Sequence, residues 1–217
     1  MNKGVLNSEL FGCVPSRIKA LFEGVSYPWE VIPRIERILD FCDTSGLREI
    51  SDGIFVGEGV SISELATLLP PLVILDSVEI RPGAYLRGKA FIGEGAVIGN
   101  SSEIKSSVIM SGAQLPHYNY VGNSIIGHKA HLGAGAVCSN LRSDKMNVTV
   151  HGDRDYETGL RKLGAAVGDL VEVGCGAVLS PGSVIGRESI IYPQALVRGV
   201  IGEGMILKAS GETVKKI

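Results

Sequence analysis

Residues 92–97 read IGEGAV, and residues 173–178 read VGCGAV. Each segment begins with an aliphatic residue, continues with glycine, and has alanine four positions after the aliphatic residue. The same spacing runs through most of the chain, because an aliphatic residue stands at every sixth position over a long stretch and a mostly small residue follows four positions later. The sixth-position residues of the first stretch are Val56, Ile62, Leu68, Ile74, Ile80, Leu86, Ile92, Ile98 and Ile104.

The period then shifts by one residue at two places. It resumes five residues after Ile104, and again five residues after Val121, and an irregular stretch covers residues 139–166. The later sixth-position residues are Ile109, Leu115, Val121, Ile126, Leu132, Cys138, Val167, Val173, Leu179, Ile185, Ile191 and Val197. The two shifts bracket the stretch around LPHYNYVG at 115–122, so we expect the surface of that region to be reshaped.

A period of six excludes most folds. Six is not a multiple of 3.6, and the 29 glycines among 217 residues would destabilise helices. A hairpin sheet would need longer strands and Asn-Gly or Asp-Gly turns. The pattern predicts an all-β solenoid with a triangular cross-section, in which three hexads make one coil, aliphatic residues face inward, and parallel coils stack about 4.8 Å apart. The hexads suffice for about seven coils.

The first fifty residues lack this period. Pro28 begins a segment with apolar residues at helical spacing, which predicts a helix with proline at its first position. Segments 8–11 and 16–22 predict shorter helices. We therefore expect two parts, a helical N-terminal cap or arm at 1–50 and the solenoid at 51–217. The simplest interpretation of the arm is that it shields the exposed edge of the first coil.

The composition narrows the class of protein. Lys and Arg total 21, Asp and Glu total 23, and the pI is about 6.1, so we expect neither nucleic acid nor an anionic membrane as a partner. No apolar run approaches the ~18 residues of a membrane helix, and no signal peptide is evident, so we expect a cytoplasmic protein. Cys13, Cys42, Cys138 and Cys175 form no CxxC pair and are interpreted as free thiols.

Several segments, in this order, resemble a known family: IRPGA at 80–84, SEIKSS at 102–107, LPHYNYVG at 115–122, HLGAGAVCSN at 131–140 and VEVGCGAVLSPGSVIG at 171–186. The hexads resemble the hexapeptide-repeat acyltransferases, whose fold is a left-handed parallel β-helix. The segments look like the acetyltransferase domain of bifunctional sugar-1-phosphate nucleotidylyltransferase/acetyltransferases, which make UDP-N-acetylglucosamine. The resemblance covers about residues 54–207, and no glycine-rich phosphate loop suggests a nucleotidyl-transfer domain.

This resemblance implies a homotrimer with active sites at subunit interfaces. It implies acetyl-CoA as cosubstrate, with no metal required, and an amino-sugar phosphate similar to glucosamine-1-phosphate as acceptor. His117 matches the general base, a role that suits an imidazole with a pKa near 6.5. Tyr120 and Asn140 match positions that bind the sugar or the acetyl group, and Arg81 and Lys105 match the pair that holds the sugar phosphate.

The resemblance also assigns the donor side and shows two departures. Ala134, Cys175 and Tyr192 match the region that lines CoA. His131 stands where the bacterial branch has Asn, and Leu141 stands where it has Tyr. Both departures are on the acceptor side, so His131 is expected to bind the acceptor, whose identity these departures leave open.

Two other functions stay open at this point. One is a non-catalytic trimeric scaffold or regulatory hexapeptide protein, which absence of CoA binding would favour. The other is a zinc carbonic anhydrase with three histidines across a trimer interface, for which the chain offers His117, His128, His131 and His151. His128 and His131 are only three residues apart, and a hexad would send them to different parts of one side, so ligation within one chain is awkward.

Overall fold

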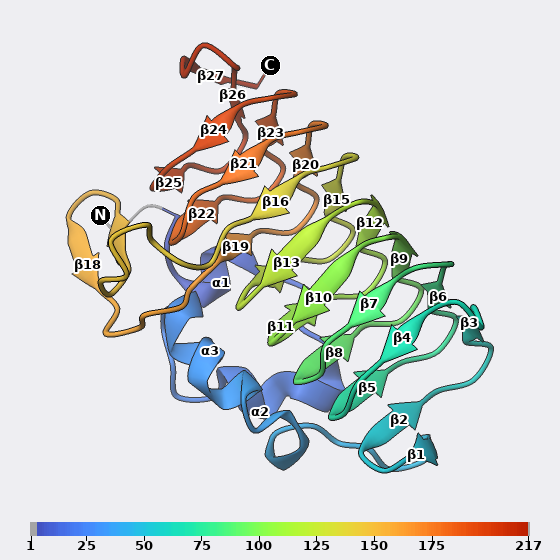
Figure 1. Ribbon diagram of the computed structural model, residues 1–217. Helices are drawn as coiled ribbons and strands as arrows, with labels where there is room; N and C mark the ends of the chain where they lie inside the picture. Colours follow the sequence, from blue (N-terminus) through green and yellow to red (C-terminus); the bar gives the residue numbers. More distant parts are fainter. Residues whose placement is uncertain (1–3, 217) are drawn as a thin grey trace.

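The hexads fold into short strands, three to a coil, that stack into three parallel sheets (Figure 1). The structure, a computed structural model, describes residues 4–216. The parallel strands form seven complete coils, from β2–β4 to β22–β24, and a last partial coil of β25 and β26. The predicted all-β solenoid is therefore confirmed, whereas the left-handed sense stays a prediction.

We number the sheets in the order in which a coil visits them. Sheet 1 has nine strands, in spatial order β1 (Arg48–Ser51), β2 (Ile54–Val56), β5 (Leu72–Ile74), β8 (Ala90–Ile92), β11 (Ser107–Ile109), β14 (Ile125–Ile126), β19 (Ala165–Val167), β22 (Ser183–Ile185) and β25 (Val200–Ile201). β1 is antiparallel to β2, and all other pairs of this sheet are parallel.

Sheet 2 also has nine strands: β3 (Ser61–Ile62), β6 (Glu79–Ile80), β9 (Val97–Asn100), β12 (Gln114–His117), β15 (His131–Leu132), β20 (Glu172–Val173), β23 (Ile190–Ile191), β26 (Met205–Leu207) and the antiparallel β27 (Thr213–Lys215). Sheet 3 has seven strands: β4 (Thr67–Leu68), β7 (Tyr85–Leu86), β10 (Glu103–Lys105), β13 (Tyr120–Gly122), β16 (Val137–Cys138), β21 (Val178–Leu179) and β24 (Leu196–Val197).

The register of the strands explains the sequence period. Ile74 pairs with Ile92, Ile92 with Ile109 and Ile109 with Ile126, so each sixth-position residue stacks on its equivalent one coil away. These side chains form one continuous buried core from the first coil to the last. Burying each one contributes roughly 1.5–3 kcal/mol, which makes the stacked column the main source of stability.

Both one-residue shifts fall at the same corner, where sheet 3 turns into sheet 1. We call this corner 3/1; its shortened turns contain Ser106 and Asn123, with φ angles of 47° and 48°. Because the shortening occurs in the turns, the pairing of the strands continues without a break, as Ile92–Ile109 and Ile109–Ile126 show.

The N-terminal arm contains the predicted helices. They are α1 (Asn7–Leu10), the 3₁₀ helix η1 (Ser16–Ile18), α2 (Lys19–Phe22), α3 (Pro28–Ile35) and the 3₁₀ helix η2 (Ile38–Asp40). Pro28 occupies the start of α3, and Trp29, Val31, Ile32 and Ile35 are buried. Among residues 4–216, no helix has the length and apolarity needed to cross a bilayer.

The helices of the arm do not lie over the edge of the first coil, so only the last residues of the arm have the predicted shielding role. These helices pack along the outer face of sheet 1, where Val73, Phe91 and Val108 share one buried cluster with Leu21 and Ile35 (Figure 1). The last residues of the arm do cover this edge on sheet 1, because β1 pairs antiparallel with β2. The helices pack elsewhere because the outward face of sheet 1 is apolar, and only a second layer could bury it.

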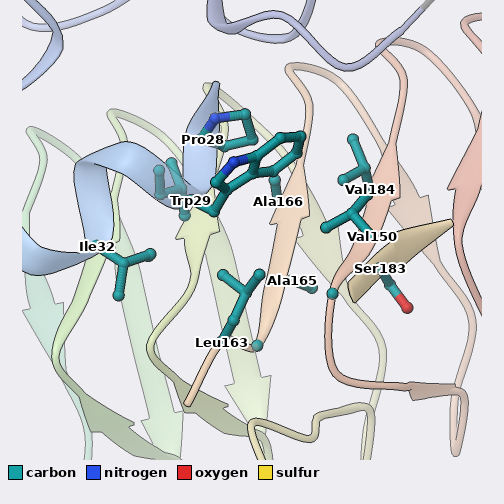
Figure 2. Close-up of a pocket in the computed structure, with 12 residues that line it drawn as sticks. Pro28, Trp29, Ile32, Val150, Leu163, Ala165, Ala166, Ser183 and Val184 are labelled. Carbon is teal, nitrogen blue, oxygen red and sulfur yellow. The ribbon is translucent and has the colours of Figure 1, made fainter. Parts of the chain in front are cut away.

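The irregular stretch at 139–166 leaves the solenoid after β16 and returns at β19. It contains a hairpin of β17 (Thr149–His151) and β18 (Asp155–Glu157), which the hexad pattern did not predict. We call residues 139–164 the insertion loop. Tyr156 of the hairpin packs against Trp29 with ring centroids 5.4 Å apart. Below Trp29, a narrow apolar gap is lined by Leu163, Ala166 and Val184 (Figure 2), so the insertion loop and the arm form one packed layer.

Candidate functional site

His117 ends β12 at the turn that joins sheet 2 to sheet 3, which we call corner 2/3. Its side chain is exposed, as the sequence predicted for a residue at the corner that follows the inward Leu115. The structure places three of the predicted residues on one column there. The Gly135 N–H donates to the His117 carbonyl at 3.0 Å, and the Gly176 N–H donates to the Ala134 carbonyl at 2.8 Å. His117, Ala134 and Cys175 therefore follow one another on successive coils.

A buried asparagine supports the backbone at His117. The Asn119 side chain accepts a hydrogen bond from the His117 N–H at 3.2 Å. Its amide donates to the Gly133 carbonyl at 2.8 Å and to the Ala136 carbonyl at 3.3 Å, and so ties this coil to the next. Asn119 is only 2% exposed. Sequence reasoning missed this residue; its signal is a polar residue between two candidate site residues in LPHYNYVG.

Tyr120 and Asn140 meet on the sheet 3 side. Tyr120 lies on the outer face of β13, in register with Glu103 and Val137. Its hydroxyl and the Asn140 amide both crowd Gly122, where an added Cβ would lie 2.6 Å from each of them. Burial raises the pKa of Tyr120, and the nearby Glu103 carboxylate raises it further. The Tyr120 hydroxyl therefore stays protonated at neutral pH and can donate a hydrogen bond.

Lys105 lies at the far end of the same sheet, at corner 3/1. The Asn123 N–H donates to the Lys105 carbonyl at 3.0 Å, and the Asn123 side chain accepts a hydrogen bond from the Asn140 amide at 2.7 Å. Burial lowers the pKa of Lys105, and the charges of Lys162 and Arg87 lower it further. Lys105, Tyr120 and Asn140 thus form one group on sheet 3 and its edge.

Arg81 is not part of that group. It follows β6 at corner 2/3, where its N–H donates to the Ile98 carbonyl at 2.9 Å. Its guanidinium is held by Glu79 through two hydrogen bonds of 3.0 and 3.1 Å. Arg81 and Lys105 are on neighbouring coils, as expected for a pair, but at different corners. The structure therefore does not bring these two cations together.

Arg87 occupies the place next to Lys105. Leu86 pairs with Ile104, and the Arg87 N–H donates to the Ile104 carbonyl at 2.8 Å, so the next residues, Arg87 and Lys105, stack on adjacent coils. The Arg87 guanidinium forms a 2.6 Å salt bridge with Glu103. Sequence reasoning missed Arg87, although it stands three hexads, or one coil, before Lys105.

The remaining predicted residues lie around corner 2/3 and sheet 2. His131 is on the outer face of sheet 2, where its Nδ1 lies 3.0 Å from Glu172, and is not among the residues on sheet 3. Tyr192 is 43% exposed and immediately precedes corner 2/3, two coils beyond Ala134. Cys175 is exposed, and the four cysteines are free. Within residues 4–216 no three His, Cys, Asp or Glu side chains gather as a possible metal site.

The site therefore spans one side of the solenoid. His117 stands at one edge of sheet 3, Lys105 and Arg87 stand at the other, and Tyr120 lies between them. The segment from His117 to Gly122, which turns corner 2/3 and then forms β13, spans at most about 17 Å, a distance that long side chains and a small sugar phosphate can bridge together. The column of Ala134 and Cys175 leads away from His117 toward the later coils.

Comparisons with known proteins find relatives of the same family that the sequence motifs resemble. Residues 68–155 match the family model described as the GMPPB C-terminal domain. The chain is 31% identical to the bifunctional protein GlmU of Methanococcus vannielii, over 100% of this chain and 53% of that protein. It is 35% identical to the bifunctional sugar-1-phosphate nucleotidylyltransferase/acetyltransferase of Sulfurisphaera tokodaii, over 88% of this chain and 51% of that protein.

The chain thus spans about half the length of these curated relatives, and the resemblance noted from its motifs is confirmed. Among solved structures, the chain is similar to the acetyltransferase domain of PglB from Neisseria gonorrhoeae in complex with acetyl coenzyme A. The match covers 70% of this chain and 55% of that one, with 17% sequence identity and a TM-score of 0.39.

Proposed function

We propose that this chain, a hexapeptide-repeat protein related to the bifunctional sugar-1-phosphate nucleotidylyltransferase/acetyltransferases, is an acetyl-CoA-dependent N-acetyltransferase acting on an amino-sugar phosphate. The observation that carries the proposal is the position of His117. It is exposed at corner 2/3, between the column of Ala134 and Cys175 on one side and Tyr120 and Lys105 on sheet 3 on the other.

In this proposal His117 acts as the general base. The neutral imidazole accepts a proton from the sugar amine while the amine nitrogen attacks the thioester carbonyl of acetyl-CoA. The new C–N bond forms, the C–S bond breaks, and the CoA thiolate leaves and is protonated. Asn119 keeps the His117 backbone in place through its 3.2 Å hydrogen bond. The reaction requires no metal.

The acceptor lies across sheet 3 with its phosphate toward corner 3/1. Lys105 and the stacked Arg87 hold the phosphate, because ammonium and guanidinium groups donate charge-assisted hydrogen bonds to phosphate oxygens. Tyr120 and Asn140 contact the sugar. Arg81 is left out of this assignment, because it stands at corner 2/3, on the other edge of the sheet from Lys105. The CoA arm follows Ala134, Cys175 and Tyr192.

A homotrimer is part of the proposal. The arm covers the outer face of sheet 1, so sheets 2 and 3 are the faces left for other copies of the chain. On sheet 3, Val178 is 39% exposed and Leu196 is 65% exposed, and they stand on adjacent coils in line with Tyr120. A second copy that covered these apolar residues would approach Tyr120 as well, which would place the active site at a subunit interface.

The direct test is acetyl transfer from acetyl-CoA, followed by release of the CoA thiol, with glucosamine-1-phosphate, galactosamine-1-phosphate and glucosamine as acceptors. The proposal expects turnover with a phosphorylated amino sugar and a trimer by sedimentation. CoA binding without turnover on any amine would contradict the enzyme and favour a scaffold. A cytoplasmic location belongs to the proposal, because its donor is acetyl-CoA.

A further inference from the structure

Trp29 of the arm packs against two separate parts of the insertion loop. Trp29 is 7% exposed, and its ring centroid lies 5.4 Å from that of Tyr156 in the hairpin. Leu163, near the returning end of the loop, is 4% exposed and lies below the same indole (Figure 2). Tyr27 stacks on the indole with the ring centroids 4.7 Å apart. One side chain of the arm therefore holds the insertion loop at two points.

Leu163 also holds the start of the insertion loop, through its backbone. Its N–H donates to the Asn140 carbonyl at 3.1 Å. Lys162 forms an antiparallel bridge with Leu141, the residue after Asn140, so the two ends of the loop run side by side. Leu163 is thus buried below Trp29 through its side chain and bonded to Asn140 through its N–H. One residue therefore links the apolar layer to the proposed acceptor site.

The position of the Asn140 side chain depends on this backbone. Its amide donates a hydrogen bond to the Asn123 side chain at 2.7 Å. The same amide and the Tyr120 hydroxyl both lie next to Gly122. An amide group presents fixed donor and acceptor atoms, so its contact with a ligand changes when its backbone moves. A displacement of about 1 Å within an active site can lower the rate about 100-fold, so the support of the Asn140 backbone matters for the reaction.

The apolar residues of the insertion loop are buried against the arm. After Asn140, residues 143–147 are all exposed, and the chain becomes buried again at Val148. Four residues of the loop belong to the same buried cluster as Trp29: Val148, Val150, Tyr156 and Leu163. A smaller side chain at position 29 would leave a cavity, and its neighbours, Leu163 among them, would move to fill part of it. Such a movement would shift the hydrogen-bonded Asn140 carbonyl as well.

We propose that Trp29 is a positioning residue for the acceptor site and acts on Asn140 through Leu163. The inference rests on the proposed function, in which Asn140 contacts the sugar, and it gives the arm a part in that function. Trp29 touches no substrate; it fixes the backbone that carries the Asn140 amide. Because coupling between two sites is reciprocal, an acceptor bound at Asn140 should also stabilise the packing around Trp29.

The test compares Trp29→Leu with two other variants of the arm. Trp29→Phe keeps an aromatic ring above Leu163, and Leu21→Ala weakens α2 at a buried residue outside the apolar gap below Trp29. The readouts are kcat and KM for glucosamine-1-phosphate and for acetyl-CoA, together with the midpoint of thermal unfolding. Trp29→Leu should reduce kcat/KM for glucosamine-1-phosphate by about 10- to 100-fold, mostly through KM, because the Asn140 amide is displaced. The KM for acetyl-CoA should not change.

Two further results support the inference. Trp29→Phe keeps most of the wild-type kcat/KM, and Leu21→Ala, with a similar fall in the unfolding midpoint, keeps the wild-type KM for glucosamine-1-phosphate. If the KM for glucosamine-1-phosphate is unchanged in Trp29→Leu, or rises equally in Leu21→Ala, the positioning role of Trp29 is overturned while the enzyme stands.

Hydrogen exchange of the wild type tests the same coupling without turnover. The backbone amides of residues 28–35 should exchange more slowly when glucosamine-1-phosphate is added. This measurement decides if Trp29→Leu does not fold. It also decides if the wild type acetylates none of the amines, a result that makes the proposed function wrong. Slower exchange supports the coupling, and unchanged exchange overturns it.

Discussion

Lys105 lies directly above Arg87 on the edge of sheet 3, with the Arg87 N–H donating to the Ile104 carbonyl at 2.8 Å. The two side chains start from backbone positions about 4.8 Å apart, which is the spacing of stacked coils. A group with several oxygen atoms, such as phosphate, fits a pair of donors at that separation. Arg81, by contrast, starts at the other edge of the sheet and is held by Glu79.

The first prediction separates the two arginines. Arg87→Ala should lower kcat/KM for glucosamine-1-phosphate by about 10-fold or more, while Arg81→Ala should leave it within about threefold of the wild type, because only Arg87 is stacked on Lys105. Steady-state kinetics with glucosamine as the second acceptor measures the phosphate preference. If kcat/KM for glucosamine-1-phosphate falls more in Arg81→Ala than in Arg87→Ala, the phosphate binds at corner 2/3 and the prediction is wrong.

The second prediction concerns the base. His117→Ala should reduce acetyl transfer by roughly 10²–10⁴-fold, because the amine loses its proton acceptor. Since the side chain is exposed, the fold and the affinity for CoA should stay near those of the wild type. His151→Ala, which removes another histidine in the hairpin of the insertion loop, is the matched control for transfer measured by thiol release. Retained transfer in His117→Ala would move the base to another residue, with His131 examined next.

The third prediction concerns the asparagine beneath the base. Asn119→Ala should destabilise the protein by about 1–3 kcal/mol, because it leaves the buried Gly133 carbonyl without its donor. The midpoint of thermal unfolding should fall by roughly 2–4 °C per kcal/mol. Acetyl transfer should also fall, since the backbone at His117 loses its 3.2 Å partner. Asn147→Ala, at an exposed position, is the control and should change neither the stability nor the transfer rate. If Asn119→Ala is as stable and as active as this control, Asn119 does not support His117.

The fourth prediction concerns acid and the arm. Burial acts to raise the pKa of Glu36, but the Lys89 ammonium and the neighbouring Ser106 and Lys105 together outweigh it, so the folded-state pKa lies below the ordinary value. A lowered carboxylate pKa stabilises the folded arm above the ordinary value of about 4.3, and the stabilisation disappears as the pH falls through the folded-state pKa. Fluorescence of Trp29, the single tryptophan, should therefore change in this range before the β signal in circular dichroism is lost.

Glu36→Gln is the control for that titration. It lacks the carboxylate, so its Trp29 signal should be the same above and below pH 4 until the solenoid itself unfolds. Superimposable acid profiles of Glu36→Gln and the wild type would show that the pair with Lys89 does not hold the arm.

The sequence predicted the core well because the solenoid is periodic. In a coil of three hexads, the neighbours of Ile92 are fixed by counting, and the shifts at 104–109 and 121–126 are accommodated at corner 3/1. The same counting would have separated Arg81 from Lys105, which are four hexads apart, because four hexads lead to the next corner. The motif resemblance does not distinguish Arg81 from Arg87, because each directly follows a sixth-position aliphatic residue.

The rest could not be derived from the period. The outward residues Val73, Phe91 and Val108 are apolar, and this is what recruits the arm to sheet 1, but the hexad pattern reports only the inward residues. The hairpin of the insertion loop and the position of Lys162 depend on contacts between segments far apart in the sequence, such as Tyr156 with Trp29. The spacing of residue types within one segment cannot predict such contacts.

A parallel β-solenoid can in principle polymerise end to end. The unpaired N–H and C=O groups of its last coil could pair with the first coil of another molecule. In this protein an antiparallel strand ends the parallel hydrogen bonding of sheet 1 at the first coil and that of sheet 2 at the last coil. β1 runs antiparallel against β2 on sheet 1, and β27 runs antiparallel against β26 on sheet 2. A second molecule stacked end to end would meet a strand of the wrong direction at either end, so the two reversed strands limit growth along the axis and leave the flanks as the surfaces for assembly.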